Sequence, residues 1–280
     1  MPSVLVTGAA RGIGRATALR LAANGWDVVA GVRRIEDGED LASSSPAPIT
    51  TVLLDVTSDE QIGSLDAVLP ARLDAVVNNA GVVVGGPLEA VSPAELSRQL
   101  EINVVGQMAV TQAVLSRIRG ARGRVVFVSS LSGRVSSPLF GAYNASKFAL
   151  EGMADALRME LAPWGIRVVL VEPAQTDTDL WRKADAVFDE TAASLSPEYR
   201  ELYAGHLEGF RKAIPRAQRM AAPVEGVAAT IERALTQRRP WARYVVGRSA
   251  QVQAVMARLT PTPILDKVLS AATGIPKRRQ

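Results

Sequence analysis

The sequence contains 280 residues, which is near the upper end for one α/β domain and enough to bury a large core. It has no cysteine, so disulfides and thiolate metal sites are excluded, and its single histidine, His206, makes a histidine metal site implausible. The net charge of +4 arises from scattered basic residues without a nucleic-acid-binding motif, so we expect no metal and no nucleic-acid partner.

Apolar runs and helical patterns alternate along the chain. The first strand begins at residue 3 or 4, which leaves no room for a signal peptide, and no apolar run approaches the roughly 18–20 residues of a transmembrane segment. We therefore expect a cytoplasmic protein. The alternation predicts an α/β fold, a doubly wound, mostly parallel Rossmann-type sheet within one domain, residues 1–250. Its predicted strands lie near 3–7, 27–32, 50–54, 74–78, 124–129, 166–171 and 243–246.

The first strand leads into a glycine-rich turn. Gly8, Gly12 and Gly14 follow the strand Val4–Val6, and a helical pattern then runs to Asn24. Glycines let the backbone approach a pyrophosphate, and a helix N-terminus offers N–H groups and the positive end of the helix dipole. The spacing is G-x-x-x-G-x-G rather than the G-x-G-x-x-G of many dinucleotide folds. The strand–turn–helix order favours a phosphate-binding turn over a tight turn without a ligand.

A long helix is predicted in the middle of the chain. Residues 92–95 read Ser-Pro-Ala-Glu, a capping box with proline at the first helical position, so the helix should run from Ser92 to about Arg119. It carries Asn103, which is either a functional residue or an ordinary helix residue.

A serine, a tyrosine and a lysine form the candidate catalytic group. Tyr143 and Lys147 are four residues apart in a predicted helix over 140–159, so they share one helix face. A nearby ammonium lowers the pKa of a tyrosine, which can then exchange a proton with an alcohol or a carbonyl. Ser130 follows the apolar strand and would lie at its carboxyl end, where open α/β sheets bind ligands. The alternative is an amphipathic helix with a chance Tyr–Lys pair.

Taken together, these motifs resemble the short-chain dehydrogenase/reductase family, in its single-domain subgroup. Residues 7–14 match the family's T-G-x-x-x-G-I-G turn, and residues 78–81 match its N-N-A-G. The serine, tyrosine and lysine match its catalytic serine and Y-x-x-x-K, and Asn103 matches the helix asparagine of its catalytic tetrad. The resemblance covers about residues 3–247 and implies an NAD(P)-dependent oxidoreductase.

The resemblance implies a role for each catalytic residue. Tyr143 would be the general acid/base, and Lys147 would lower its pKa and hold the nicotinamide ribose. Ser130 would orient the substrate oxygen, and Asn103 would hold a water in a proton relay.

The predicted cofactor site draws on several loops. Asp55 would contact adenine, although it could be only a turn residue, and Thr176 and Thr178 could instead cap the following segment. Ala174 replaces the glycine of the family's usual Pro-Gly, which bears on how the nicotinamide is placed. The expected cofactor-binding residues are Gly8, Arg11, Gly12, Ile13, Gly14, Arg33, Asp55, Val56, Asn79, Ala80, Gly81, Tyr143, Lys147, Pro173, Thr176 and Thr178.

The end of the second strand favours NADP over NAD. NAD enzymes place an acidic residue there for the ribose 2′-hydroxyl, whereas this chain has Val32 followed by Arg33. Arg11 lies within the glycine turn, and two guanidinium groups suit a 2′-phosphate. In the alternative, Glu36 or Asp37 reaches the ribose and the cofactor is NAD.

The last third of the sequence contains a predicted lid and tail. Apolar residues mixed with charges over 177–222 suggest short helices over an apolar substrate, with Leu139, Ser130, Tyr143 and Trp181 as expected contacts. Residues 251–280 form a predicted helical extension with an apolar stripe of Val252, Val255, Met256 and Leu259. This extension should pack on the core or a partner subunit, or, less favoured, lie on a membrane surface. A homodimer or homotetramer follows by analogy with the family.

These features predict an NADP(H)-dependent oxidoreductase that interconverts a secondary alcohol and a ketone, or an alcohol and an aldehyde, on a small, apolar molecule. The alternatives are an NAD(P)-binding regulatory or scaffold protein without turnover and a nucleotide-sugar epimerase or dehydratase. The different glycine spacing and the lack of a separate substrate domain argue against the latter.

Overall fold

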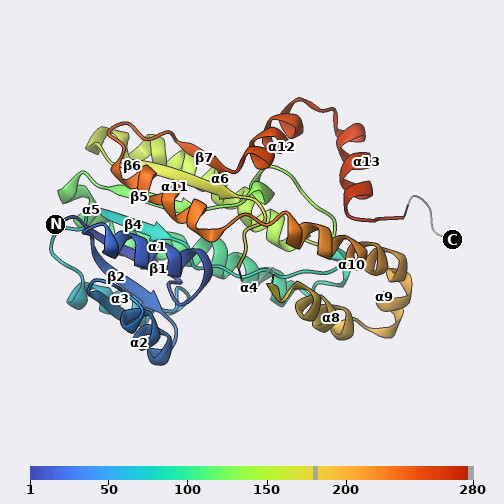
Figure 1. Cartoon of the computed structure of the whole chain (residues 1–280), viewed down its shortest axis with the longest axis horizontal. Helices are drawn as coiled ribbons and strands as arrows, with labels where there is room; N and C mark the ends of the chain where they lie inside the picture. Colours follow the sequence, from blue (N-terminus) through green and yellow to red (C-terminus); the bar gives the residue numbers. More distant parts are fainter. Residues whose placement is uncertain (179–181, 277–280) are drawn as a thin grey trace.

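The computed structural model describes residues 1–178 and 182–276 and is built around a parallel sheet of seven strands (Figure 1). The strand order is β3-β2-β1-β4-β5-β6-β7, which confirms the predicted doubly wound topology. Every predicted strand is present, with ends that differ by at most two residues. The strands are β1 (Ser3–Thr7), β2 (Asp27–Val32), β3 (Ile49–Leu53), β4 (Ala75–Asn78), β5 (Arg124–Val128), β6 (Arg167–Pro173) and β7 (Arg243–Val246).

Helices cover both faces of this sheet (Figure 1). Successive side chains of a strand point to opposite faces, so Val4 and Val6 of β1 join one apolar cluster while Leu5 joins the other. The first cluster is closed by α1 (Gly12–Ala23), α2 (Ile35–Ser43) and α11 (Val224–Thr236). The second is closed by α3 (Asp59–Val68), α5 (Gly106–Ala121) and α6 (Gly141–Leu161). The strand order reverses between β1 and β4, where such sheets hold ligands at their carboxyl ends.

The predicted long helix after Ser92 is interrupted. It starts as α4 (Pro93–Leu100), and the Ser92–Glu95 capping box is present as expected. A π-helical turn over Glu101–Val105 follows, and the helix resumes as α5. The apolar pattern did not reveal the turn, because one wide turn disturbs the 3.6-residue period only locally. Asn103 lies inside this turn, a type of irregularity that is frequent at functional sites.

Two groups of helices extend from the same end of the domain (Figure 1). The predicted lid contains α8 (Ala184–Ser194), α9 (Pro197–Leu202) and α10 (Ala204–Arg219). The tail contains α12 (Arg248–Leu259) and α13 (Thr262–Ala272). The end of the tail returns to the lid, since a Cβ on either Gly209 or Gly274 would collide with the backbone of the other glycine.

The tail packs through a different face from the apolar stripe that the sequence suggested. Ala250 and Ala254 of α12 pack against Leu131 in the loop after β5. The residues of the predicted stripe are exposed, Leu259 most of all at 72%. Small residues allow a helix to approach a loop closely, whereas an apolar stripe by itself does not show which surface it faces.

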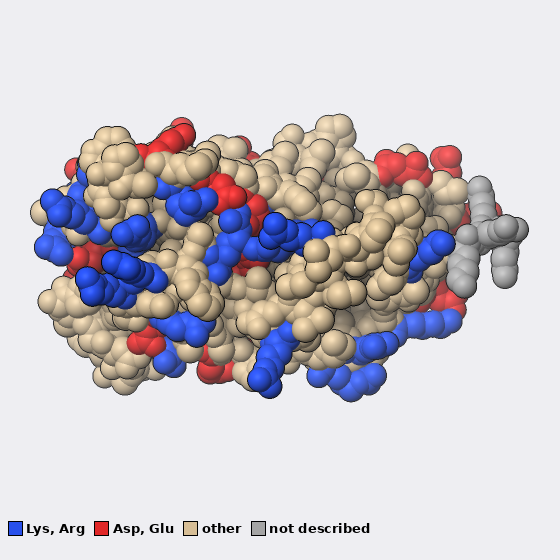
Figure 2. Space-filling model, turned by 90° about the horizontal axis from the view of Figure 1, so that it is seen from above, with Lys and Arg blue, Asp and Glu red and all other residues tan. Residues whose placement is uncertain are grey.

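The described surface carries charges of both signs. Figure 2 shows Lys and Arg side chains in several separate groups on one face of the molecule, with Asp and Glu side chains between some of them. None of the helices within residues 1–178 and 182–276 is long and apolar enough to cross a lipid bilayer.

Candidate active site

The glycine positions of the turn between β1 and α1 do not readily accept a side chain. Gly8 and Gly12 have φ angles of +63° and +55°, in the left-handed region that favours glycine. A Cβ on Gly14 would collide with the carbonyl oxygen of Gly8. Helix α1 begins at Gly12, and no side chain of the described residues caps its N-terminus at Arg11. The N–H groups of this first turn therefore suit an anionic ligand.

Thr7 and Asn79 brace the glycine turn. The Oγ1 atom of Thr7 accepts hydrogen bonds of 3.0 Å from the backbone N–H groups of Asn79 and Ala80. The Nδ2 group of Asn79 donates to the carbonyl oxygens of Thr7 and Gly8 at 3.0 and 3.1 Å. The Asn79 side chain thus joins the ends of β1 and β4 and holds the turn in place.

Three buried amides on the α4–α5 helix hold the segment that follows β4. Gln99 accepts from the N–H of Val84 and donates to the carbonyl of Val82, at 2.6 and 2.8 Å. Asn103 bonds both backbone groups of Val82, at 2.9 and 3.0 Å, and Gln107 donates to the carbonyl of Ala80 at 2.7 Å. Gln99 and Gln107 were not among the predicted site residues, although amides spaced four residues apart along one helix were a usable signal.

Asn103 also reaches the catalytic helix. Its Nδ2 group donates to Ser146 Oγ at 3.1 Å, one residue before Lys147. The side-chain amide is thus engaged by Val82 and Ser146. The role of Asn103 in a water relay stays a prediction.

Ser130, Tyr143 and Lys147 converge beyond the carboxyl end of β5. Ser130 caps the turn after this strand, where its Oγ accepts from the N–H of Ser132 at 3.1 Å, and it lies close enough to Tyr143 to lower the pKa of its hydroxyl. Lys147 lies one turn after Tyr143 on α6, with its Nζ 5.8 Å from the centroid of the tyrosine ring. Lys147 Nζ donates to the carbonyl of Val128 at 2.8 Å. The three side chains predicted to work together are therefore adjacent.

Burial controls the protonation of this group. It raises the pKa of Tyr143, and the hydrogen bond with Ser130 opposes that effect. Burial also lowers the pKa of Lys147 to about 8, against the attraction of the Glu151 carboxylate. In this structure Tyr143 is therefore a proton donor at neutral pH. The expected lowering of its pKa by Lys147 stays a prediction.

The strand register brings the predicted ribose and adenine residues together. β1 pairs Thr7 with Gly31, and β2 pairs Val32 with Leu53, so Arg33 emerges between the glycine turn and Asp55. Hydrogen bonds from Thr57 lower the pKa of Asp55, and the charge of Arg33 acts in the same direction. Arg33 and Asp55 share a surface hollow whose remaining lining is Thr57, Ser97, Arg98, Glu101 and Ile102.

Glu36 and Asp37, the alternative contacts for the ribose, lie in the first turn of α2 and not at the end of β2. Glu36 forms an exposed ion pair of 3.2 Å with Arg34, and Asp37 lies with it in the first turn of α2. Val32, at the position where an acid would be expected for NAD, is buried.

The loops after β6 and before α6 supply the remaining candidates. The hydroxyl of Thr176 donates to the carbonyl of Ala174 at 3.1 Å, and Thr178 lies against Gly12 of the glycine turn. Leu139 has a φ of +65°, which is strained for a leucine, and its carbonyl accepts from the N–H of Gly86 at 2.8 Å. Trp181 lies outside the described residues.

Val56 and Pro173 complete the set of predicted cofactor residues. Val56 is buried beneath α5, where its carbonyl closely approaches Gly106. Pro173 ends β6 opposite Val246 of β7. Both shape the carboxyl edge of the sheet.

An aromatic cluster joins the lid to the catalytic helix. The ring of Phe140, three residues before Tyr143, lies 5.4 Å from that of Phe210 on α10. Phe210 lies 5.7 Å from Phe188 on α8. Two lid helices thus meet the start of α6 through partly buried apolar rings.

Comparison with known proteins places this geometry in a family. Residues 2–187 match the family model described as short chain dehydrogenase. The NADPH-dependent 3-dehydrocapnine reductase of Ornithobacterium rhinotracheale is 32% identical over 96% of each chain. Retinol dehydrogenase 5 of Mus musculus is 32% identical over 95% of this chain and 87% of its own.

Solved structures agree in fold. A short chain dehydrogenase from Burkholderia cenocepacia J2315 in complex with NADP superposes with a TM-score of 0.74, at 25% identity and 98% coverage of both chains. One from Burkholderia phymatum in complex with NAD has a TM-score of 0.76 at 22% identity, covering 91% of this chain and 92% of its own. The chain therefore belongs to the short chain dehydrogenase family and is an enzyme of that family, an oxidoreductase of the alcohol–ketone type.

Proposed function

We propose that this protein is an NADP(H)-dependent reductase or dehydrogenase that interconverts a secondary alcohol and a ketone, or an alcohol and an aldehyde, with Tyr143 as the general acid/base. The observation that carries the proposal is the convergence of Ser130, Tyr143 and Lys147 beside the glycine turn. These residues come from β5 and α6, whereas the turn comes from the other half of the sheet. The catalytic group at the end of β5 and the glycine turn at the end of β1 lie on either side of β4, next to the point where the strand order reverses, which suits a reaction between a bound dinucleotide and a small molecule.

The residues around the glycine turn fit a dinucleotide. Gly14 lets the start of α1 pack directly on Gly8, where a Cβ would collide with the carbonyl oxygen of Gly8, and the uncapped start of α1 offers its N–H groups to a phosphate. Arg33 beside the turn favours the 2′-phosphate of NADP, and Arg11 adds a second positive charge. The relationship to an NADPH-dependent reductase supports the same choice.

The chemistry follows from the three catalytic side chains. A bound nicotinamide supplies or accepts a hydride at its C4 atom. In the reductive direction, Tyr143 donates its hydroxyl proton to the carbonyl oxygen, and Ser130 donates a hydrogen bond that stabilises the developing negative charge. The Lys147 ammonium then stabilises the tyrosinate that remains. In the oxidative direction, the tyrosinate takes the proton from the alcohol.

We propose an apolar substrate because of the lid. Phe140, Phe188 and Phe210 bring three aromatic rings to the junction of the lid with the catalytic helix. Leu139, held in a strained conformation, precedes Phe140 in the same loop. Apolar rings with few polar partners favour a substrate whose body is hydrocarbon, in keeping with the similarity to a retinol dehydrogenase.

We further infer a homodimer or homotetramer in the cytoplasm. Helix α6 exposes two large apolar side chains, Phe148 at 44% and Met159 at 64% exposure, which suit a contact with a second copy. These two residues are eleven positions apart, so they lie on one face of the helix.

The substitution Tyr143→Phe tests the proposed function. Oxidation of NADPH should be followed with a panel of apolar ketones and aldehydes, and the variant should lose at least about 100-fold in kcat because no acid remains at the carbonyl oxygen. Tyr244→Phe is the control, since Tyr244 bonds Gln237 and Trp241 away from the site. Turnover by Tyr143→Phe at the wild-type rate would refute the mechanism. Tight cofactor binding by the wild type without turnover on any substrate would favour the scaffold alternative.

A further inference from the structure

The face of α6 that carries the catalytic pair continues into the core. Tyr143, Lys147, Glu151 and Asp155 follow one another at intervals of four residues, so they form one stripe along the helix. Glu151 is only 7% exposed, and its carboxylate is therefore withdrawn from water directly behind Lys147. A buried carboxylate at this place requires partners, because an isolated buried charge is strongly unfavourable.

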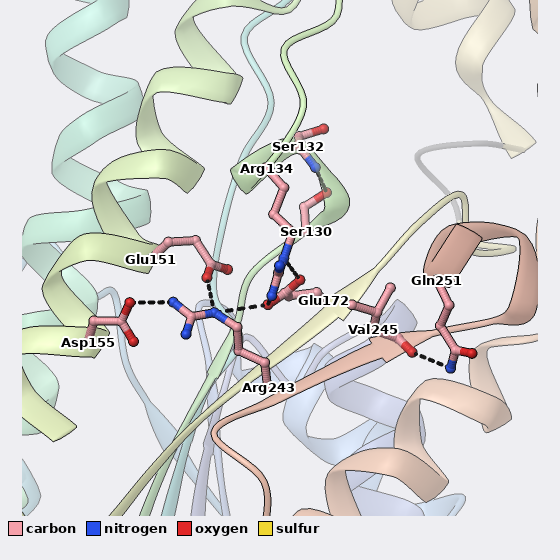
Figure 3. Close-up of polar contacts among 9 residues, drawn as sticks. All are labelled: Ser130, Ser132, Arg134, Glu151, Asp155, Glu172, Arg243, Val245 and Gln251. Atoms are coloured by element: carbon pink, nitrogen blue, oxygen red, sulfur yellow. Dashed lines mark hydrogen bonds and ion pairs between the residues drawn. The ribbon is translucent and has the colours of Figure 1, made fainter. Parts of the chain in front are cut away.

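Those partners form a charged cluster between the sheet and α6 (Figure 3). Glu172 on β6 is fully buried. Its two carboxylate oxygens accept hydrogen bonds from Nε and Nη2 of Arg134, with the Nη2–Oε1 bond at 2.8 Å. Arg243 on β7 bonds Glu151 at 3.0 Å and Asp155 at 2.5 Å, and it lies 3.4 Å from Glu172. Four segments of the fold thus meet in one network.

The network touches the catalytic loop as well as the catalytic helix. Arg134 follows Ser130 in the turn after β5, and Gly133 between them sits tightly against α6. A Cβ on Gly133 would stand 2.9 Å from Cγ of Glu151 and 3.1 Å from both the Lys147 carbonyl oxygen and Ser129 Oγ. The Glu151 side chain therefore lies at the contact between the turn that carries Ser130 and the helix that carries Lys147.

Glu151 lies one turn after Lys147 on α6, and its carboxylate attracts the Lys147 ammonium. Besides Lys147, the charged groups of this region are Glu151, Asp155 and Arg158 from α6, Arg134 from the turn after β5, Glu172 from β6 and Arg243 from β7. Arg134 grips Glu172, whereas Glu151 is the acid whose attraction acts on Lys147. Without Glu151, the buried ammonium of Lys147 would lose the acid whose attraction raises its pKa.

We propose that Glu151 is a positioning residue of the active site, which keeps Lys147 positively charged at working pH and holds the Ser130 turn against α6. The proposal rests on the proposed function for its consequence in catalysis, because a neutral Lys147 could not stabilise the tyrosinate. Its electrostatic part can be tested without turnover.

The direct test is the titration of Lys147 by NMR in the protein without cofactor. The chain has five lysines, so protein labelled at lysine 13Cε gives few signals, and that of Lys147 is identified by its loss in Lys147→Arg. In wild type its pKa should be about 8. In Glu151→Gln the midpoint should fall by about one pH unit, because an attractive charge has been removed. The control is Arg158→Gln, which breaks an ion pair with Asp155 on the same helix. It should leave the titration midpoint of Lys147 unchanged.

The pH dependence of reduction provides a readout that a purely structural role would not produce. At acidic pH the activity of Glu151→Gln should be nearly that of wild type. As the pH rises, its activity should be lost at a lower pH than in wild type, by the same shift as in the NMR titration. Glu151→Asp keeps the charge and should restore most of the profile. An unshifted Lys147 titration in folded Glu151→Gln, or a kcat reduced equally at every pH, would overturn the proposal.

A reciprocal experiment remains decisive if Glu151→Gln does not fold. Coupling between two sites acts equally in both directions, so Lys147→Met should make the Glu151 carboxyl titrate at higher pH by about one pH unit. An unchanged carboxyl titration would overturn the proposal. If the Lys147–Glu151 coupling is found but Tyr143→Phe retains full turnover, the proposed function fails while the coupling stands.

Discussion

Arg33 stands at the carboxyl end of β2, between the glycine turn and Asp55, where it can meet the substituent on the adenine ribose. We expect NADPH to bind more tightly than NADH in a titration followed by cofactor fluorescence. Arg33→Ala should weaken NADPH binding by at least about tenfold, since a charge-assisted hydrogen bond to phosphate is lost, and should leave NADH nearly unaffected.

Arg34→Ala is the matched control for Arg33→Ala. Arg34 is adjacent in sequence but is paired with Glu36 on the surface. Arg34→Ala should therefore change NADPH affinity much less than Arg33→Ala does. Equal or tighter binding of NADH by the wild type would mean that Glu36 or Asp37 reads the ribose.

At the scale of residues, the motifs predicted which residues form the site better than they predicted which partners those residues contact. The spacing of Tyr143 and Lys147 was enough to place both on one helix face, which the structure confirms. The partners of Asn79 could not be predicted, because an amide can bond any nearby backbone group and the sequence does not show which strand end is near. For the same reason the pairing of Glu151 with Arg243, ninety-two positions apart, was not foreseen.

At the scale of elements, the amides of the α4–α5 helix act as a brace for residues 80–84. Gln99→Leu should destabilise the protein by about 1–2 kcal/mol, since the N–H of Val84 loses its partner and the carbonyl of Val82 keeps only the bond from Asn103. NADPH affinity should also fall several-fold as the loop beside the glycine turn loosens. Urea unfolding and a cofactor titration provide the two measurements.

Gln112→Leu offers a control on the same helix. Gln112 is exposed on α5, so its replacement should change the free energy of unfolding by less than about 0.5 kcal/mol. If Gln99→Leu were as stable as Gln112→Leu, the brace would contribute nothing.

The regular elements were largely predictable, whereas the irregular ones were not. Continuous apolar runs marked the central strands of the sheet, because strands buried on both faces need apolar residues at successive positions, whereas the edge strand β3 contains two threonines. The π-helical turn at Glu101–Val105 has no such mark, since its cause lies in packing and not in local preference. The face of α12 that packs on the core was also hidden, because Ala250 and Ala254 contribute little to an apolar pattern.

At the scale of the whole molecule, exposed apolar residues on α6 predict association between copies. Purified wild type should have the mass of a dimer or tetramer by light scattering. Phe148→Asp should shift it toward the monomer, because a charge would be buried without a partner at the contact. Val68→Asp, at a comparably exposed position on α3, should leave the mass unchanged. A monomeric wild type, or an unchanged mass of Phe148→Asp, would contradict the predicted assembly.

The backbone contact between Gly209 on α10 and Gly274 after α13 constrains how this protein can diverge. Either glycine could gain a side chain only if the lid and the tail moved apart, since each occupies the place of the other's Cβ. The two positions, far apart in the chain, should therefore vary together among close relatives. Lineages that retain this tail should keep both residues small, and those that lose the tail should be free to change position 209.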